Sequence, residues 1–149
     1  MGEVALIGLS SGTAITLTVT APATAGDDFV DGTDNSRYLQ YSSNVIAGQT
    51  RTITANWAAG NTAPAGCSLR LEVTAINVPP GHQGGSPAGR ISMSTTATPI
   101  VTGIGGCATG TAATSGAQLT YTLQVDTPGS LVAGASTTVT VTFTLQDDA

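Results

Sequence analysis

The sequence predicts an all-β protein, an antiparallel Greek-key β-sandwich of the jelly-roll or immunoglobulin-like kind with eight or nine strands. Three observations favour this fold. Threonine alternates with apolar residues at a period of two in several segments, whereas no segment has convincing helical periodicity. Clusters of glycine, proline, aspartate and asparagine separate these segments at the spacing that sandwiches have.

The most regular alternation lies in residues 138–145 and predicts a half-buried strand. Its apolar residues share one face: Val139, Val141, Phe143 and Leu145. Threonine suits the opposite, wet face because its β-branched side chain favours extended backbone. The same pattern predicts strands at residues 13–20 and 118–125.

Shorter runs, some apolar throughout and some alternating, predict the remaining strands. They lie at residues 3–9, 37–42, 49–57, 68–74, 90–94 and 99–102. The first of these could be a strand of the sheet or an extension that docks elsewhere. Residues 78–89 contain three prolines and four glycines, which predicts a loop.

Length predicts one domain over residues 1–149, with residues 1–12 forming an exchangeable N-terminal strand and its hinge. The chain has nine acidic residues, four arginines and no lysine, so its net charge is -5. Scattered cations of this number argue against binding to nucleic acid or to an anionic membrane surface. No apolar run reaches the length of a membrane span, so membrane insertion is not expected.

The composition favours a secreted, extracellular or cell-surface protein. No basic segment followed by a long apolar segment begins the chain, so we expect either a cytosolic protein or a mature form whose leader peptide has been removed. An acidic, lysine-free, threonine-rich surface favours the second alternative. Cys67 and Cys107 predict a disulfide bond worth about 4 kcal/mol, the alternative being two buried thiols.

Residues 27–35 hold four carboxylates and an amide. Such oxygen atoms are the ligands that calcium prefers, although the spacing is not that of an EF-hand. A calcium site would use Asp28, Asp31 and Asp34, whereas the alternative is a solvated turn. No other cofactor is expected.

Nothing in the chain predicts an enzyme. The two glutamates, Glu3 and Glu72, do not suggest a catalytic carboxylate pair, and His82 stands alone in the proline–glycine loop. The nucleophile-elbow, phosphate-loop and dinucleotide motifs are absent from the sequence.

The few aromatic residues allow two interpretations. Trp57 with Tyr38 or Tyr41 could form an exposed platform for a sugar ring. The alternative places these rings in the core, because Trp57 continues the parity of Ile53. The platform would make the chain a carbohydrate-binding or adhesion module, acting on surface glycans or other surface proteins and dependent on calcium if the aspartate loop binds it.

The N-terminal segment predicts self-association. Its apolar residues are Val4, Leu6, Ile7 and Leu9. A Ser-Ser-Gly hinge follows at residues 10–12, so the segment could pair with a sheet edge of another copy. Repetition of this head-to-tail contact would build a filament from copies of the same chain. The alternative is an ordinary first strand within its own sheet.

Residues 134–143 resemble the final strand of secreted bacterial fimbrial and spore-coat-type β-sandwich subunits, which end in similar valine–threonine alternation. The resemblance implies a structural protein of a pilus, filament or surface layer that is built by strand exchange. The cysteine pair departs from the short N-terminal spacing usual in those subunits.

Overall fold

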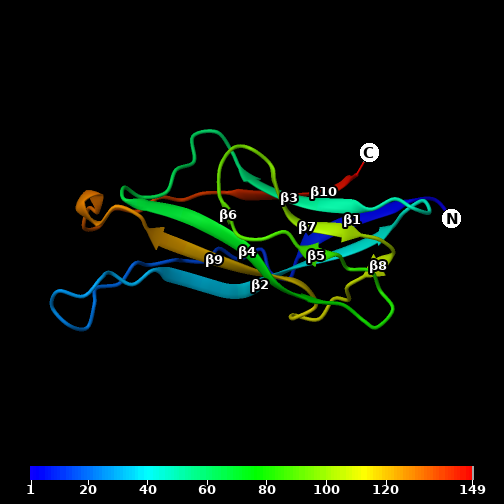
Figure 1. Ribbon diagram of the computed structural model, residues 1–149, viewed down its shortest axis with the longest axis horizontal. Helices are drawn as coiled ribbons and strands as arrows, with labels where there is room; N and C mark the ends of the chain where they lie inside the picture. The colour runs from blue at the N-terminus through cyan, green and yellow to red at the C-terminus, as the bar shows by residue number, and fades with distance from the viewer. Residues whose placement is uncertain (149) are drawn as a thin grey trace.

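The computed structural model describes residues 1–148, which form ten strands and one short 3-10 helix (Figure 1). The strands are β1 (Val4–Leu9), β2 (Gly32–Asn44), β3 (Arg51–Trp57), β4 (Cys67–Asn77), β5 (Ser86–Pro87), β6 (Ile91–Ser92), β7 (Thr98–Ile104), β8 (Cys107–Ala108), β9 (Gly116–Val125) and β10 (Val141–Asp147). The helix, η1, spans Pro128–Ser130. No helix in residues 1–148 is long and apolar enough to cross a bilayer.

The strands form two antiparallel sheets. The larger sheet has the order β1-β2-β9-β4-β6, with β8 pairing the end of β2, and the smaller has the order β10-β3-β7-β5. The prediction of an all-β sandwich is therefore confirmed. The number of strands exceeds the predicted eight or nine because β5 and β8, of two residues each, lie outside the predicted strands.

The core lies between the sheets, and the alternation of apolar residues places them there. In β4, Leu69, Leu71 and Val73 are buried, as their shared parity predicts. The neighbouring strand β9 adds Leu119 and Tyr121 from the same side. Burial of each such side chain contributes about 1.5–3 kcal/mol, so these central strands anchor the sandwich.

The C-terminal strand keeps the predicted alternation but is shorter than predicted. From Val141 onward, apolar residues are half-buried and the threonines between them are exposed. β10 pairs with β3 only, so it forms an edge of the smaller sheet. Residues 136–140 precede the strand and take no part in either sheet.

The prediction of a strand at residues 13–20 is wrong. Only Thr20 pairs, in an isolated bridge with Val30. The segment lies instead across Gly32, where a Cβ atom would stand 2.7 Å from the backbone nitrogen of Thr18. The side chains still alternate, because Ile15 packs against the core while the threonines are exposed.

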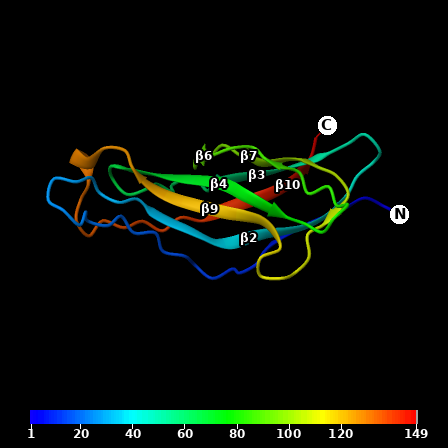
Figure 2. The same cartoon turned by 60° about the horizontal axis from the view of Figure 1, so that its bottom comes forward.

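The two chain ends lie at the same end of the molecule. Figures 1 and 2 both show the N-terminus and C-terminus together, near the beginning of β1 and the end of β10. The loops at residues 21–31 and 126–135 lie at the opposite end in both views.

Candidate assembly site

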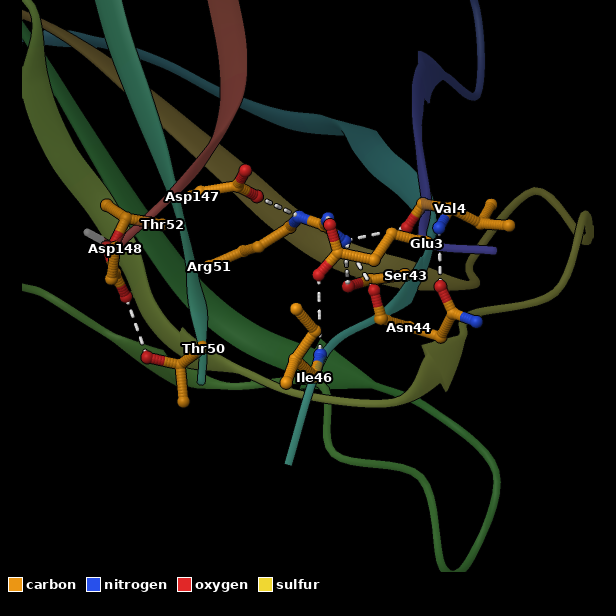
Figure 3. A network of polar contacts seen from close by, with 10 residues as sticks. All are labelled: Glu3, Val4, Ser43, Asn44, Ile46, Thr50, Arg51, Thr52, Asp147 and Asp148. Atoms are coloured by element: carbon orange, nitrogen blue, oxygen red, sulfur yellow. Dashed lines mark hydrogen bonds and ion pairs between the residues drawn. The ribbon is translucent and has the colours of Figure 1, made fainter. Parts of the chain in front are cut away.

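One buried arginine joins the two sheets at the end where the termini meet (Figure 3). Arg51, the first residue of β3, donates from Nε to Oδ1 of Asp147 in β10 over 2.7 Å. Its Nη1 donates to the backbone oxygens of Val4 and Asn44, each at 2.7 Å, and to Oγ of Ser43 at 3.2 Å. Because a buried charge needs such partners, Arg51 fastens β1 and β2 to the opposite sheet.

Further polar contacts fasten the residues next to both termini. Oδ1 of Asp148 accepts a hydrogen bond from the Thr52 hydroxyl at 2.6 Å, and Oδ2 accepts one from the Thr50 hydroxyl at 2.7 Å. These bonds lower the pKa of the Asp148 carboxyl, since they favour its ionised form. On the N-terminal side, Oε2 of Glu3 lies 4.0 Å from Nη2 of Arg51.

The sequence indicates that Arg51 is buried, although it does not indicate why. Arg51 has the same parity as Ile53 and Trp57, which are both buried. A charged residue on the core face of a strand requires buried partners. The sequence does not identify those partners, because they come from three other strands.

β1 is an edge strand with apolar side chains on both faces. It pairs with β2 from Val4 opposite Asn44 to Leu9 opposite Leu39. Of the four residues predicted for strand exchange, Ile7 packs against the core. The other three are exposed: Val4 at 38%, Leu6 at 65% and Leu9 at 42%. The single chain therefore leaves much of the apolar surface of β1 in water.

The two sides of the sandwich differ in how their edges are protected. On one side the edge strands β5 and β6 have two residues each, and β5 contains Pro87. Short edges and proline hinder pairing with another chain. On the other side the edge strands are β1, with six residues, and β10, with seven, and neither contains proline or lysine. The second side is the one open to strand addition.

The structure does not bring the predicted calcium ligands together. Oδ1 of Asp31 accepts a hydrogen bond from the backbone N–H of Val125 at 2.9 Å. Asp34 belongs to β2 and accepts hydrogen bonds from the N–H and hydroxyl of Ser36, whereas Asp28 stays in the preceding loop. Within residues 1–148 no three His, Cys, Asp or Glu side chains form a group suited to a metal.

The three aromatic residues form no shared exposed platform, because Trp57 and Tyr41 belong to the core, as the alternative interpretation predicts. Trp57 and Tyr41 are buried, and Tyr38 is half-buried in β2. The Tyr41 hydroxyl donates to the backbone oxygen of Gly84 at 2.6 Å. Burial raises the pKa of Tyr41 far above its usual range, and the nearby Cys107 adds to the effect.

The predicted disulfide between Cys67 and Cys107 is also wrong, because the two thiols are free and lie at opposite ends of the larger sheet. Cys67 is opposite Val125 at one end, and Cys107 is opposite Ser43 at the other. The strand length between these positions is roughly 40 Å at the usual rise per residue. Paired cysteines have Cα atoms no more than about 7 Å apart, so this fold excludes the bond within one chain.

The single histidine, His82, belongs to the proline–glycine loop. His82 is exposed, and its Nδ1 accepts a hydrogen bond from the N–H of Ala108 at 2.9 Å, which holds the proline–glycine loop to β8. An open hollow of about 470 Å³ lies beyond the end of β4. It is lined by Ile76, Asn77, Val78, Pro79, Thr109, Thr114 and Ser115.

Comparison with known proteins adds no relative. No family model, no curated protein and no solved structure matches the chain.

Proposed function

We propose that this chain is an extracellular or cell-surface structural protein that assembles with copies of itself into a filament or surface layer by exchange of β1. The observation that carries the proposal is the state of β1 in the single chain. It is an edge strand with apolar side chains on both faces, of which Leu6 is 65% exposed. Strands of this composition are usually buried on both faces.

Exchange would give β1 the same contacts in a neighbouring copy. The Ser-Ser-Gly segment at residues 10–12 follows β1 directly and supplies the hinge. The β2 edge and the Arg51 guanidinium of one copy would then receive the strand of the next, with the hydrogen bond from Arg51 to the Val4 backbone oxygen retained. A contact of this head-to-tail kind continues into a filament when it does not close into a ring.

Lack of charge on the exchanging strand supports the same role. Residues 4–9 carry no charge, and neither does the following stretch as far as residue 26. Charged residues on an edge strand are the usual protection against pairing with another chain. Exchange by itself leaves Val4, Leu6 and Leu9 as exposed as in the single chain, so their burial would come from further contacts between the joined copies.

A reversible lock of β1 onto its own chain tests the proposal. Ala5 and Ser43 lie directly opposite each other, so Ala5→Cys with Ser43→Cys can form a cross-strand disulfide. Cys67→Ser and Cys107→Ala remove the native thiols. We expect the oxidised protein to stay monomeric in negative-stain electron microscopy and light scattering, and the same protein to form filaments after reduction.

The control is the chain with the two native cysteines replaced but without the lock, with and without reductant. Assembly that is equal in the oxidised and reduced forms of the locked variant would contradict exchange of β1. Monomers in every sample would contradict self-assembly as a whole. An adhesion or carbohydrate-binding module would then be the hypothesis, and the hollow beyond β4 would be the first surface to test on a glycan array.

A further inference from the structure

A second segment on the open side of the sandwich has the pattern of a strand but no partner. Residues 14–19 form no backbone hydrogen bond with any other part of residues 1–148. Both ends of the segment are nevertheless fixed. Nη2 of Arg37 donates to the backbone oxygen of Thr13 at 2.9 Å, and Thr20 and Val30 exchange two backbone hydrogen bonds at 2.9 and 3.0 Å.

The side chains of the segment are already sorted as in a strand. Ile15, Leu17 and Val19 are half-buried, and Thr16 and Thr18 are exposed. The segment has no charge, no proline and no glycine. Free backbone N–H and C=O groups in an extended segment of this composition form a template for pairing with another chain.

We propose that two copies of the chain pair through residues 14–20, antiparallel and around a two-fold axis at Leu17, to form a dimer. Such pairing breaks no backbone hydrogen bond along residues 14–19 of either copy, because none exists there. Exchange of β1, by contrast, would first require this strand to leave β2 of its own chain. The same surface of each copy meets itself, so the contact closes as a symmetric pair.

The register follows from the alternation. Residues directly opposite each other in an antiparallel pair share one face, so apolar residues must stand opposite apolar residues. An axis at Leu17 puts Ile15 opposite the partner's Val19 and Thr16 opposite the partner's Thr18. Every half-buried residue then meets an apolar one, and the threonines form cross-strand pairs on the wet face.

This contact is independent of the exchange of β1. Exchange joins copies head to tail, whereas pairing at residues 14–20 joins them two by two. Either contact could form without the other. The test therefore uses the full chain with β1 locked to β2 by the oxidised disulfide described above, so that association through β1 does not contribute.

Two variants with opposite charge patterns test the register. In Thr16→Lys with Thr18→Lys, each lysine would stand opposite a lysine of the partner. We expect the dimer dissociation constant from analytical ultracentrifugation to rise about tenfold, since like charges opposite each other destabilise a strand pair. In Thr16→Lys with Thr18→Glu, each lysine would stand opposite a glutamate, and we expect the dissociation constant to return to near that of the parent.

Three results would overturn the proposal. A locked parent that stays monomeric at every concentration would exclude the dimer, and a double-lysine variant that dimerises as the parent does would exclude the segment. A lysine–glutamate variant that stays as weak as the double-lysine variant would exclude the axis at Leu17. Hydrogen exchange needs no substitution at the contact. Every second amide within residues 14–19 would donate to the partner and should become protected as concentration rises. Unchanged exchange would also overturn the proposal.

Discussion

Arg51 and Asp147 join the beginning of β3 to the end of β10, with Nε of the arginine 2.7 Å from Oδ1 of the aspartate. The two side chains differ in exposure: that of Arg51 is 4% exposed and that of Asp147 is 70% exposed. The guanidinium therefore depends mainly on its other partners, the backbone oxygens of Val4 and Asn44 and the buried hydroxyl of Ser43. Loss of the guanidinium should therefore lower the free energy of unfolding more than loss of the carboxylate does.

Replacement of Arg51 by methionine should lower the free energy of unfolding by about 2–3 kcal/mol, because two backbone oxygens and the buried Ser43 hydroxyl lose a charged donor. Asp147→Asn should cost less than about 1 kcal/mol, as expected for an exposed partner. Urea unfolding measures both. Arg90→Met is the control, since within residues 1–148 the Arg90 guanidinium makes one exposed hydrogen bond, to the side chain of Gln124. This change should alter stability by less than about 0.5 kcal/mol. Equal losses for Arg51→Met and Arg90→Met would contradict the buried role.

Acid should weaken the C-terminal attachment through Asp148. Its pKa in the folded protein is lowered by hydrogen bonds from Thr52 and Thr50. The ionised carboxylate therefore stabilises the fold above the unfolded pKa of about 3.9, and this contribution is lost as pH falls through the lower, folded pKa. Melting temperatures between pH 6 and pH 2, read at close intervals, should fall less steeply in Asp148→Asn than in the parent. Thr52→Val should also make the fall in melting temperature with pH less steep. An identical pH dependence in all three proteins would contradict the prediction.

Both cysteines should be titratable as free thiols without a reductant. Burial raises the pKa of both thiols, and for Cys67 the carboxylates of Asp126 and Asp31 raise it further. The reactive thiolates are therefore scarce at neutral pH, and alkylation should accelerate as pH rises. Mass spectrometry should show the half-buried Cys67 modified before the buried Cys107, and both modified after unfolding. Resistance of both residues until reduction would indicate a disulfide and contradict the structure.

One buried hydroxyl in the smaller sheet should be dispensable. Oγ1 of Thr54 is buried and has no hydrogen-bond partner within residues 1–148. Thr54→Val removes this unsatisfied group, so the free energy of unfolding should stay constant or rise by up to about 1 kcal/mol. Thr52→Val is the matched control in the same strand, because the Thr52 hydroxyl donates to Asp148 and its loss should destabilise. Similar destabilisation by both changes would argue that Thr54 has a partner.

The alternation of apolar and polar residues predicted correctly the strands that pack one face against the core. It did not predict which segments pair, because pairing depends on residues distant in the sequence. Leu69, Leu71 and Val73 needed only their own alternation to be placed in the core. Residues 13–20 show equal alternation, yet the segment lies over Gly32 instead of in the ladder. The local pattern fixes which side chains point inward but not whether a neighbour offers a free edge.

The candidate assembly site was predicted in part. The apolar residues of β1 are evident from the sequence, whereas the contacts of Arg51 are not. Those contacts involve Val4, Asn44 and Asp147. Because these residues are far apart in the sequence, the sequence alone does not show that they lie together. The predicted disulfide failed for the same reason, because cysteine spacing does not reveal which end of a sheet each thiol occupies.

Because both termini lie at one end of the molecule, attachment through either terminus would orient the protein in the same way. A carrier, dye or affinity tag attached to either end of the described chain would project beside β1 and the end of β10. The loops at residues 21–31 and 126–135, at the far end, would then point away from the attachment surface. A sequence inserted in those loops would be displayed outward, whereas a bulky fusion at either terminus would crowd the strand proposed for exchange.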